Sequence, residues 1–386
     1  MRYNFDKVID RSGTSAEKVE GLKHIWGRTD LIPLWVADMD FATAPFVTDA
    51  IRKRCENEVL GYTGKPDSYY NAIINWVKQR YDLVVAKEMI NFVPGIVPGI
   101  GMAMNCFTQK GDKVMIQPPV YHPFAWVTTR NERTLVTNPL KWENGMYRMD
   151  LDTFREQIKG CKLFILCNPH NPGGVVWTEA ELRAIADICY DEKVLVFSDE
   201  IHADLTLPPH THRPFATVSE KARMNSVTFM SPSKAFNMPG LSASHALIFN
   251  EDLRKRFRIY MDAGELDMGH VFAFLSVEAA YSHGTEWLDQ CLAYIQGNID
   301  FVDDFLKNHA PKIKAIRPEA SYLVWLDCRE LKLSQKDLNE FFVDKAHLAL
   351  NDGEMFGKEG IGFMRLNVAS PRCIIEKAMK QLADAY

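Results

Sequence analysis

Lys234 lies within residues 231–240, where serine hydroxyls come just before it and a glycine follows. A lysine amine can form a covalent bond with an aldehyde once its surroundings keep it uncharged. Alone, a lysine beside serines usually marks a solvated loop. Three more segments, residues 168–174, 198–202 and 363–367, carry amide, carboxylate and guanidinium groups in that order along the chain. Together the four segments supply the groups that pyridoxal phosphate requires, because a protein must bind, orient and polarise that cofactor.

Two of these groups follow strand-like runs, the place where open α/β sheets meet their ligands. Asp199 comes directly after Val194–Ser198, and its carboxylate could keep a pyridine nitrogen protonated. Asn171 could donate to a phenolic oxygen. The structural alternatives are a helix N-cap for Asp199 and a plain turn for the Asn–Pro pairs. Two Asn–Pro pairs only three residues apart favour the functional interpretation of Asn171.

The segment 95–101 is rich in glycine and precedes the helical run Met102–Phe107. Backbone N–H groups at a helix N-terminus after a glycine turn form an anion site, so a phosphate could bind here. The glycine spacing differs from the Gly-x-Gly-x-x-Gly dinucleotide pattern. Ser231 and Ser233 could complete the phosphate site with their hydroxyls. By itself, the glycine segment would be an ordinary loop in most proteins.

Two further side chains could contact the cofactor ring and the substrate. Tyr121 follows the strand-like run Lys113–Gln117 and could stack its ring on the cofactor, with its hydroxyl available to the substrate. A tyrosine in the core or at its rim is the alternative. Arg365 lies in the apolar run Gly362–Asn367. An arginine in such a run is usually functional or paired, and its guanidinium can hold a carboxylate with two hydrogen bonds.

Composition narrows the class of protein. The chain has 386 residues, which suggests two domains, or one large domain with an appendage. It is 47% hydrophobic and 25% charged, as in soluble globular proteins with ample core. A net charge of -5 gives no basic footprint for nucleic acid, so no nucleic-acid partner is expected. No run of about 18 uncharged apolar residues predicts a membrane span, and the first residues lack an apolar signal core.

The cysteines indicate a cellular compartment. Eight are scattered along the chain without a Cys-x-x-Cys pair, and several lie in apolar runs. This pattern favours buried free thiols in a reducing cytoplasm over a disulfide framework. The ligand spacing predicts no structural zinc site, so no metal is expected.

The elements that must position these groups alternate through the middle of the chain. Lys162–Cys167 is strand-like, Glu179–Glu192 is an amphipathic helix, and Val194–Ser198 is again strand-like. Val227–Met230 and His245–Phe249 follow as further β-type runs. This alternation predicts an α/β layer with a mainly parallel sheet, and the continuous apolar strands predict helices on both sheet faces.

After about residue 285 the pattern changes to that of a smaller α+β unit. Its predicted elements are the helices Glu286–Asn308 and Gln335–Val343, the strands Tyr322–Leu326 and Gly362–Asn367, and a last helix from Arg372. The first 45 residues have no clear period and are expected to pack with this unit. The prediction is therefore a large domain over residues 46–284, and a small domain made of residues 1–45 together with 285–386.

Taken together, these residues resemble the fold-type I pyridoxal phosphate enzymes of the aspartate aminotransferase superfamily, over essentially the whole chain. More narrowly, the sequence resembles the MalY/PatB carbon–sulfur lyases of the cystathionine β-lyase type. The segments that carry the narrower resemblance are residues 33–41, 119–124, 167–172, 198–202 and 234–241. The set, in this order, is specific for the subgroup. It implies the fold-type I architecture, with a large α/β domain and a smaller α+β domain.

The resemblance implies a role for each matching residue. Lys234 carries the cofactor covalently and acts as general base, and Tyr121 is also counted as catalytic. The cofactor contacts implied by the family are made by Lys234, Asn171, Asp199, Tyr121, Val97, Pro98, Ser231, Ser233 and His202. Arg365 binds the substrate carboxylate, and Asp38 belongs to the substrate site. Tyr62 matches a tyrosine that reaches the neighbouring subunit's phosphate, so a homodimer with shared active sites is implied.

Three positions depart from the pattern of many aminotransferases. Ser242 stands where an arginine often contacts the phosphate, which removes a cationic partner and fits the lyase subgroup. His202 stands where a tyrosine often supports the phenolic oxygen, and Gly173 replaces a more usual threonine.

The resemblance implies α,β-elimination from an L-amino acid that carries sulfur at Cβ. Cystathionine would give homocysteine and cysteine would give sulfide, each with pyruvate and ammonia. Transamination uses the same residues and stays open, as does a regulatory protein that keeps the cofactor site. The sequence does not rank cystathionine against cysteine or other S-substituted cysteines.

Overall fold

A mixed sheet lies at the centre of the larger unit in the computed structural model, which describes residues 2–386. Its seven strands follow the order β2-β10-β9-β8-β7-β3-β4. Only β10 runs antiparallel to its neighbours, and the other pairs are parallel, as the alternating pattern predicts. The strands are β2 Ile90–Val93, β10 Ser244–Leu247, β9 Ser226–Met230, β8 Leu195–Asp199, β7 Cys161–Cys167, β3 Lys113–Ile116 and β4 Thr134–Thr137.

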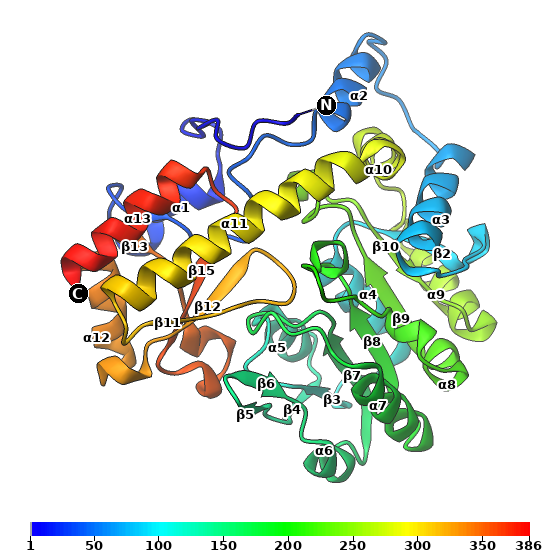
Figure 1. The fold of residues 1–386 in the computed structure, drawn as a ribbon. Helices are drawn as coiled ribbons and strands as arrows, with labels where there is room; N and C mark the ends of the chain where they lie inside the picture. The colour runs from blue at the N-terminus through cyan, green and yellow to red at the C-terminus, as the bar shows by residue number, and fades with distance from the viewer. Residues whose placement is uncertain (1) are drawn as a thin grey trace.

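Helices cover both faces of this sheet (Figure 1). Alternate side chains of one strand enter different apolar clusters, as Phe164 and Ile165 of β7 do. The strands are therefore buried on both faces, which explains their unbroken apolar runs. The helices of this unit are α2 Pro45–Cys55, α3 Asp67–Tyr81, α4 Ile96–Phe107, α5 Pro123–Arg130, α6 Leu151–Gln157, α7 Glu179–Asp191, α8 Glu220–Met224, α9 Glu251–Ala263 and α10 Val271–His283; a ribbon of β5 Lys141–Glu143 and β6 Met146–Arg148 lies beside them.

Helix α7 shows how a local pattern in the sequence predicts a helix. Thr178 and Glu181 form a capping box, in which the Thr178 hydroxyl accepts from the Glu181 N–H and the Glu181 carboxylate accepts from the Thr178 N–H. Leu182, Ile185 and Cys189 are buried at helical spacing. The cap and the apolar stripe are both local, so the predicted start at Glu179 agrees with the structure.

The smaller unit contains a four-stranded antiparallel sheet in the order β11-β12-β15-β14. Helices α11 and α13 pack side by side against it (Figure 1). Its elements are α1 Glu17–Trp26, β1 Ile32–Pro33, α11 Thr285–His309, β11 Lys314–Ile316, β12 Leu323–Asp327, α12 Gln335–Glu340, β13 Leu348–Ala349, β14 Asn351–Asp352, β15 Phe363–Asn367 and α13 Arg372–Ala385. The parallel pairing of β1 with β13 joins the N-terminal residues to this unit and favours the predicted domain division.

Helices α1, α4 and α12 are among the elements that differ from the sequence prediction. Helix α1 was not expected, because it has no side-chain cap at Ala16 and buries only three of its residues. Helix α4 begins at Ile96, well before the predicted Met102, because its first turns contain the glycines that suggested a loop. Helix α12 ends at Glu340 and continues as a π-turn over Phe341–Lys345.

Residues 35–41, called the strap below, cross between the two units without forming a strand. Side chains hold its carbonyl oxygens in place of a neighbouring strand. The donors are Arg365 to Trp35, Asn367 to Val36 and to Asp38, Lys234 and Tyr322 to Ala37, and Asn237 to Met39 and to Phe41. The strap is therefore attached by hydrogen bonds to both units.

A buried group of charges anchors the strap at one end. The Lys18 side chain is fully buried, and its Nζ lies 2.8 Å from the Asp40 carboxylate and 3.6 Å from that of Asp38. Arg11 pairs with the same two carboxylates, at 3.1 Å and 2.6 Å respectively. The Ser370 hydroxyl donates to Asp40 over 2.6 Å. A buried lysine is stable only with such partners, so this group fixes the strap relative to α1.

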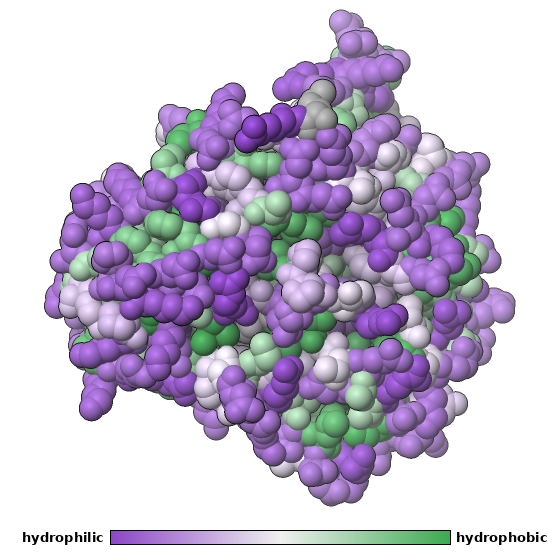
Figure 2. Space-filling model, viewed as in Figure 1, coloured by the Kyte–Doolittle hydropathy of each residue, from purple (hydrophilic) through white to green (hydrophobic). Residues whose placement is uncertain are grey.

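Hydrophilic residues cover most of the face in Figure 2, and apolar residues show between them in small groups. Among residues 2–386, no helix is long and apolar enough to cross a bilayer.

Removal of the buried Lys18 charge should destabilise the fold. We expect Lys18→Met to lower the free energy of unfolding by about 2–3 kcal/mol, because two carboxylates would be left with Arg11 as their cationic partner. The cost stays below the full penalty for an unpaired buried charge because both carboxylates are partly exposed. Urea denaturation followed by circular dichroism measures the change.

Lys255→Met is the matched control for this change. Lys255 pairs with Glu251 on an exposed helix face, where the two side chains are 65% and 66% accessible. Its removal should cost less than about 0.5 kcal/mol. Equal losses for the two variants would contradict the role given to Lys18.

Candidate functional site

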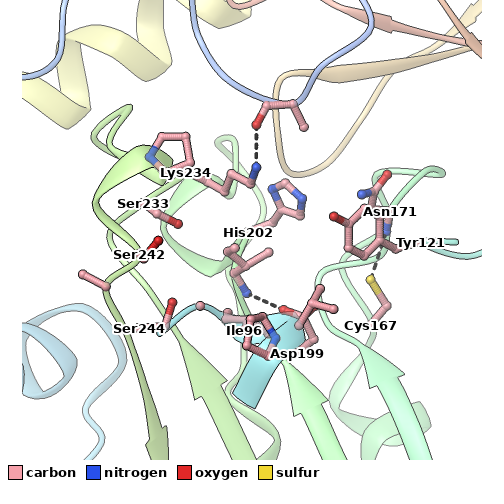
Figure 3. Close-up of a pocket in the computed structure, with 17 residues that line it drawn as sticks. Ile96, Tyr121, Cys167, Asn171, Asp199, His202, Ser233, Lys234, Ser242 and Ser244 are labelled. Atoms are coloured by element: carbon pink, nitrogen blue, oxygen red, sulfur yellow. Dashed lines mark hydrogen bonds between the residues drawn. The ribbon is translucent and has the colours of Figure 1, made fainter. Parts of the chain in front are cut away.

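A cavity of about 200 Å³ lies where the carboxyl ends of β7 and β8 face the strap and the start of α4. Parallel strands bring their carboxyl ends to one edge of the sheet, so side chains far apart in sequence meet there. Figure 3 shows Ser242, Ser244 and Ile96 on one side of the cavity and Asn171 and Tyr121 on the opposite side. Most of the residues predicted to contact a cofactor line it, namely Lys234, Asn171, Asp199, Tyr121, Val97, Pro98, Ser233 and His202.

The Lys234 amine projects into the cavity from the loop after β9. Its Nζ donates to the Ala37 carbonyl of the strap over 2.6 Å. Burial lowers the pKa of Lys234 to about 8, with Arg365 acting in the same direction and Asp38 and Asp199 opposing it. The uncharged amine, which is the form that can attack a carbonyl or accept a proton, is therefore available near neutral pH.

Asp199 ends strand β8 and is buried beneath the cavity (Figure 3). Its Oδ1 accepts from the Ile201 N–H over 3.1 Å, and within residues 2–386 no basic side chain lies at ion-pair distance. Burial raises the pKa of this carboxyl to about 7. A cationic group placed against it would favour the ionised form. The protonated ring nitrogen of pyridoxal phosphate is such a group, so this end of the cavity fits the predicted cofactor.

The start of α4 forms the other end of the cavity. Gly95 precedes the helix with φ +120, a conformation that side chains rarely adopt. The first N–H groups of a helix have no partner within it, so those of Ile96 and Val97 are available to an anion. Pro98 lines the cavity but has no N–H to donate. Ile96, which lies in the predicted segment 95–101 but was not singled out, is therefore a backbone donor beside Val97, while Pro98 can only line the site.

The serines divide into two groups. The Ser231 hydroxyl donates to the Ala243 carbonyl over 2.7 Å and accepts from the Ser233 N–H over 3.1 Å. Ser231 therefore supports the loop rather than lining the cavity, which differs from the prediction. Ser233, Ser242 and Ser244 line it instead. With the N-terminus of α4, these three neutral hydroxyls make one side of the cavity suitable for a phosphate.

Tyr121 and His202 lie against the middle of the cavity (Figure 3). Burial raises the pKa of Tyr121, so its hydroxyl stays protonated. Burial lowers the pKa of His202 to about 3, and its buried Nδ1 has no hydrogen-bond partner within the described chain. A buried polar atom without a partner is uncommon in proteins. A bound cofactor or substrate could form the hydrogen bond that this nitrogen lacks.

Arg365 lies behind Asn171 and is buried. It donates to Asn171 Oδ1 over 3.0 Å, to the Trp35 carbonyl over 3.1 Å and to Asn351 Oδ1. All three acceptors are uncharged, and Nε has no partner among residues 2–386. Burial lowers the pKa of this guanidinium to about 10. A buried cation with neutral partners suits a carboxylate ligand, as predicted for an amino-acid substrate.

Four predicted residues do not line the cavity: Ser231, Arg365, Asp38 and Tyr62. The Asp38 carboxylate pairs with Arg11 and lies near Lys18, and at the cavity it acts through its charge, which raises the pKa of Lys234. Tyr62 lies in the loop between α2 and α3 with 98% of its surface exposed. Its predicted contact with a neighbouring subunit's phosphate stays a prediction.

Sequence analysis also missed residues that the fold brings to the site. Tyr322 donates to Ala37, Asn351 accepts from Arg365, and Cys167 lines the cavity beside Asn171. Tyr322 and Cys167 end or begin apolar runs that are typical of core, so nothing local marked them. Asn351 lies in a two-residue strand that has no pattern of its own.

Comparisons with known proteins agree on the family of this chain. Residues 29–382 match the family model of aminotransferase class I and II. The chain is 38% identical to cystathionine beta-lyase PatB of Bacillus subtilis over 384 residues, 99% of each chain. It is 31% identical to the protein MalY of Escherichia coli over 387 residues, which is 99% of this chain and 98% of MalY.

A solved structure agrees with these relatives. The pyridoxal-phosphate-bound C–S lyase from Staphylococcus hominis superposes with a TM-score of 0.92 at 35% identity, covering 100% of this chain and 98% of that one. The family resemblance and the fold class predicted from the motifs are confirmed.

Asp199 should contribute to cofactor affinity through the ring nitrogen alone. We expect Asp199→Asn to weaken binding of pyridoxal phosphate to the apoprotein by roughly 10- to 100-fold, the value of one charge-assisted hydrogen bond. Equilibrium titration followed by absorbance measures the affinity.

An analogue of the cofactor with carbon in place of the ring nitrogen is the control. The natural protein should bind this analogue more weakly than pyridoxal phosphate, whereas the Asn variant should bind the two with similar affinity. If the Asp199→Asn variant still strongly prefers pyridoxal phosphate, the pairing assigned to Asp199 is wrong.

Proposed function

We propose that this chain, which belongs to the class I and II aminotransferase family, is a pyridoxal-phosphate-dependent carbon–sulfur lyase. It would carry out α,β-elimination on L-cystathionine, cysteine or related S-substituted cysteines, and release a thiol or sulfide with pyruvate and ammonia. The observation that carries the proposal is full-length similarity to PatB, named a cystathionine beta-lyase, and to a C–S lyase structure. The buried amine and carboxylate that line one cavity, with the guanidinium that lies behind Asn171, are the groups this chemistry needs.

The substrate would be held by its carboxylate. Arg365 can offer a buried guanidinium to that group, while its bonds to Asn171 and Asn351 fix the orientation of the guanidinium plane. Because Asn171 Oδ1 accepts from Arg365, its Nδ2 remains the donor for the cofactor's phenolic oxygen. Substrate and cofactor would thus be positioned by one connected set of hydrogen bonds.

Lys234 would move the proton. Pyridoxal phosphate, when bound, withdraws electrons from the substrate Cα. The Lys234 Nζ takes the Cα proton, the Cβ–S bond breaks with its electron pair remaining on sulfur, and the protonated lysine can return a proton to the leaving thiolate. The released enamine hydrolyses to pyruvate and ammonia. With the pKa of Lys234 lowered to about 8, the amine can both accept and return a proton near neutral pH.

The assembly and location belong to the same proposal. A homodimer is supported by the loop residues Val59, Leu60 and Tyr62, whose apolar side chains are largely exposed in the single chain. In such a dimer Tyr62 would complete the partner's phosphate site. A cytoplasmic location is supported by the cysteines, which are free thiols throughout the described chain.

Transamination is the alternative for the same residues. It differs in where a proton is returned to the substrate, and both reactions need Lys234, Asp199 and Arg365. The presence of Ser242 at a position where many aminotransferases have a phosphate-binding arginine favours the lyase. A requirement for a keto acid during turnover would favour transamination.

The proposed reaction is tested by product analysis. We expect the protein with pyridoxal phosphate and L-cystathionine, without any keto acid, to release pyruvate and free thiol in equal amounts. Lys234→Ala should abolish turnover because the proton acceptor is gone, while some cofactor still binds through the other contacts. Activity that appears only after a keto acid is added, or that survives in Lys234→Ala, would contradict the proposal.

Arg365 should act mainly on substrate binding. We expect Arg365→Lys to raise KM about 10- to 100-fold with a smaller loss of kcat, because lysine cannot offer two parallel donors to a carboxylate. Steady-state kinetics on L-cystathionine separates the two effects. Arg329→Lys is the matched control, because Arg329 lies over the Phe363 ring at the surface of the same sheet and pairs with Asp327. Similar KM changes in both variants would contradict the assignment.

A further inference from the structure

Lys234 and Tyr322 donate to one oxygen atom. The Lys234 Nζ lies 2.6 Å from the Ala37 carbonyl oxygen, and the Tyr322 hydroxyl lies 2.9 Å from the same atom. The two donors come from the large and the small unit, and the acceptor belongs to the strap between them. Figure 3 shows the Lys234 amine turned toward the strap and away from Asp199.

The shared carbonyl is held in place by its neighbours. Asn367 Nδ2 donates to the Val36 carbonyl and to the Asp38 carbonyl, each over 2.7 Å. The peptide groups on both sides of Ala37 are therefore fixed, and the Ala37 oxygen cannot turn away from its two donors. The Tyr322 ring is fully buried in the main apolar cluster, so its hydroxyl is fixed as well.

Tyr322 remains a donor at all working pH values. Burial raises the pKa of its hydroxyl well above the usual value, and Asp38 acts in the same direction. Lys234, in contrast, changes charge near pH 8. The groups that face its amine are Asp38 on the strap, Asp199 after β8, His202, and Arg365 on β15. None of these groups donates a hydrogen bond to Ala37 O, so Tyr322 alone competes with the lysine for that oxygen among residues 2–386.

We propose that Tyr322 is a positioning residue for Lys234, which weakens the hold of the Ala37 carbonyl on the lysine amine by donating to the same oxygen. The proposal rests on the proposed function only in taking Lys234 as the working amine. A carbonyl that already accepts one hydrogen bond is a poorer acceptor for a second donor. The Ala37 carbonyl of the strap thus accepts a hydrogen bond from the Lys234 amine. Tyr322 weakens that bond, so the charged form of the amine is stabilised less.

The test measures the charge state of Lys234 without substrate. Apoprotein is mixed with excess pyridoxal phosphate at a series of pH values, and the first-order rate of covalent capture is followed by absorbance. Borohydride trapping and peptide mass analysis identify Lys234 as the modified residue. The rate follows the fraction of uncharged amine, so its midpoint reports the pKa of Lys234, near 8 in the natural protein.

Removal of the competing donor should shift this midpoint upward. We expect Tyr322→Phe to raise it by on the order of half a pH unit, because the Ala37 oxygen then serves the lysine ammonium alone. Replacement of Tyr322 by 3-fluorotyrosine, whose hydroxyl is a stronger donor, should shift the midpoint downward. In turnover assays below the midpoint, Tyr322→Phe should lower kcat about threefold with KM unchanged, and the loss should disappear at higher pH.

Tyr69→Phe is the matched control. Tyr69 is equally buried in the same cluster, and its hydroxyl has no partner among residues 2–386. This variant should keep the midpoint of the natural protein, with both variants checked for folding by circular dichroism. Superimposed capture profiles for Tyr322→Phe and the natural protein, or shifts of the same sign for phenylalanine and 3-fluorotyrosine, would overturn the proposal. Because no sulfur substrate is present, the result does not depend on whether the lyase reaction is correct.

Discussion

The buried peptide groups of the strap need hydrogen-bond partners, and side chains of the site supply them. Residues 35–41 run through the interior without a neighbouring strand, yet their peptide groups need hydrogen-bond partners as any buried backbone does. Side chains supply these partners, and they include Lys234, which lines the cavity, and Arg365, which lies behind Asn171. The requirement to satisfy the backbone therefore places both cations at defined points. The same hydrogen bonds to the strap therefore position Lys234 and Arg365 and connect the two units.

Burial then sets the charges of the groups so placed. In the protein alone, burial disfavours the ionised forms of both Asp199 and Lys234, since each lacks a close partner of opposite charge. Arg365 keeps its charge but has only neutral acceptors. Among residues 2–386, Asp199 and Lys234 in the cavity and Arg365 behind Asn171 therefore each lack a close partner of opposite charge, a need that a bound ligand could meet. The groups that would meet it are a ring nitrogen, an aldehyde and a carboxylate, which together describe the cofactor and an amino acid.

The sequence was most informative where structure is local. Asp199 and Asn171 follow recognisable strands, and the topology of a parallel sheet is enough to bring such residues to one edge. Helix α7 was predicted at its first residue because its cap and its apolar stripe lie within one segment. The family motifs added Lys234 and Arg365, whose types alone did not decide their roles.

What escaped prediction depends on contacts between distant segments. Tyr322 and Asn351 act through hydrogen bonds to the strap and to Arg365, and nothing in their own neighbourhood distinguishes them from core residues. Asp38 was assigned to the substrate site because it lies in a family motif, whereas in the structure its carboxylate pairs with Arg11 at 2.6 Å and lies 3.6 Å from Lys18. The phosphate end of the cavity has a separate consequence, which concerns how salt affects cofactor retention. Ile96, Ser242 and Ser244 offer dipoles rather than charges there, and within residues 2–386 no arginine lines the cavity. Attraction between dipoles and an enclosed phosphate is barely screened by mobile ions, so cofactor retention in this protein should tolerate changes in salt that would loosen an arginine clamp.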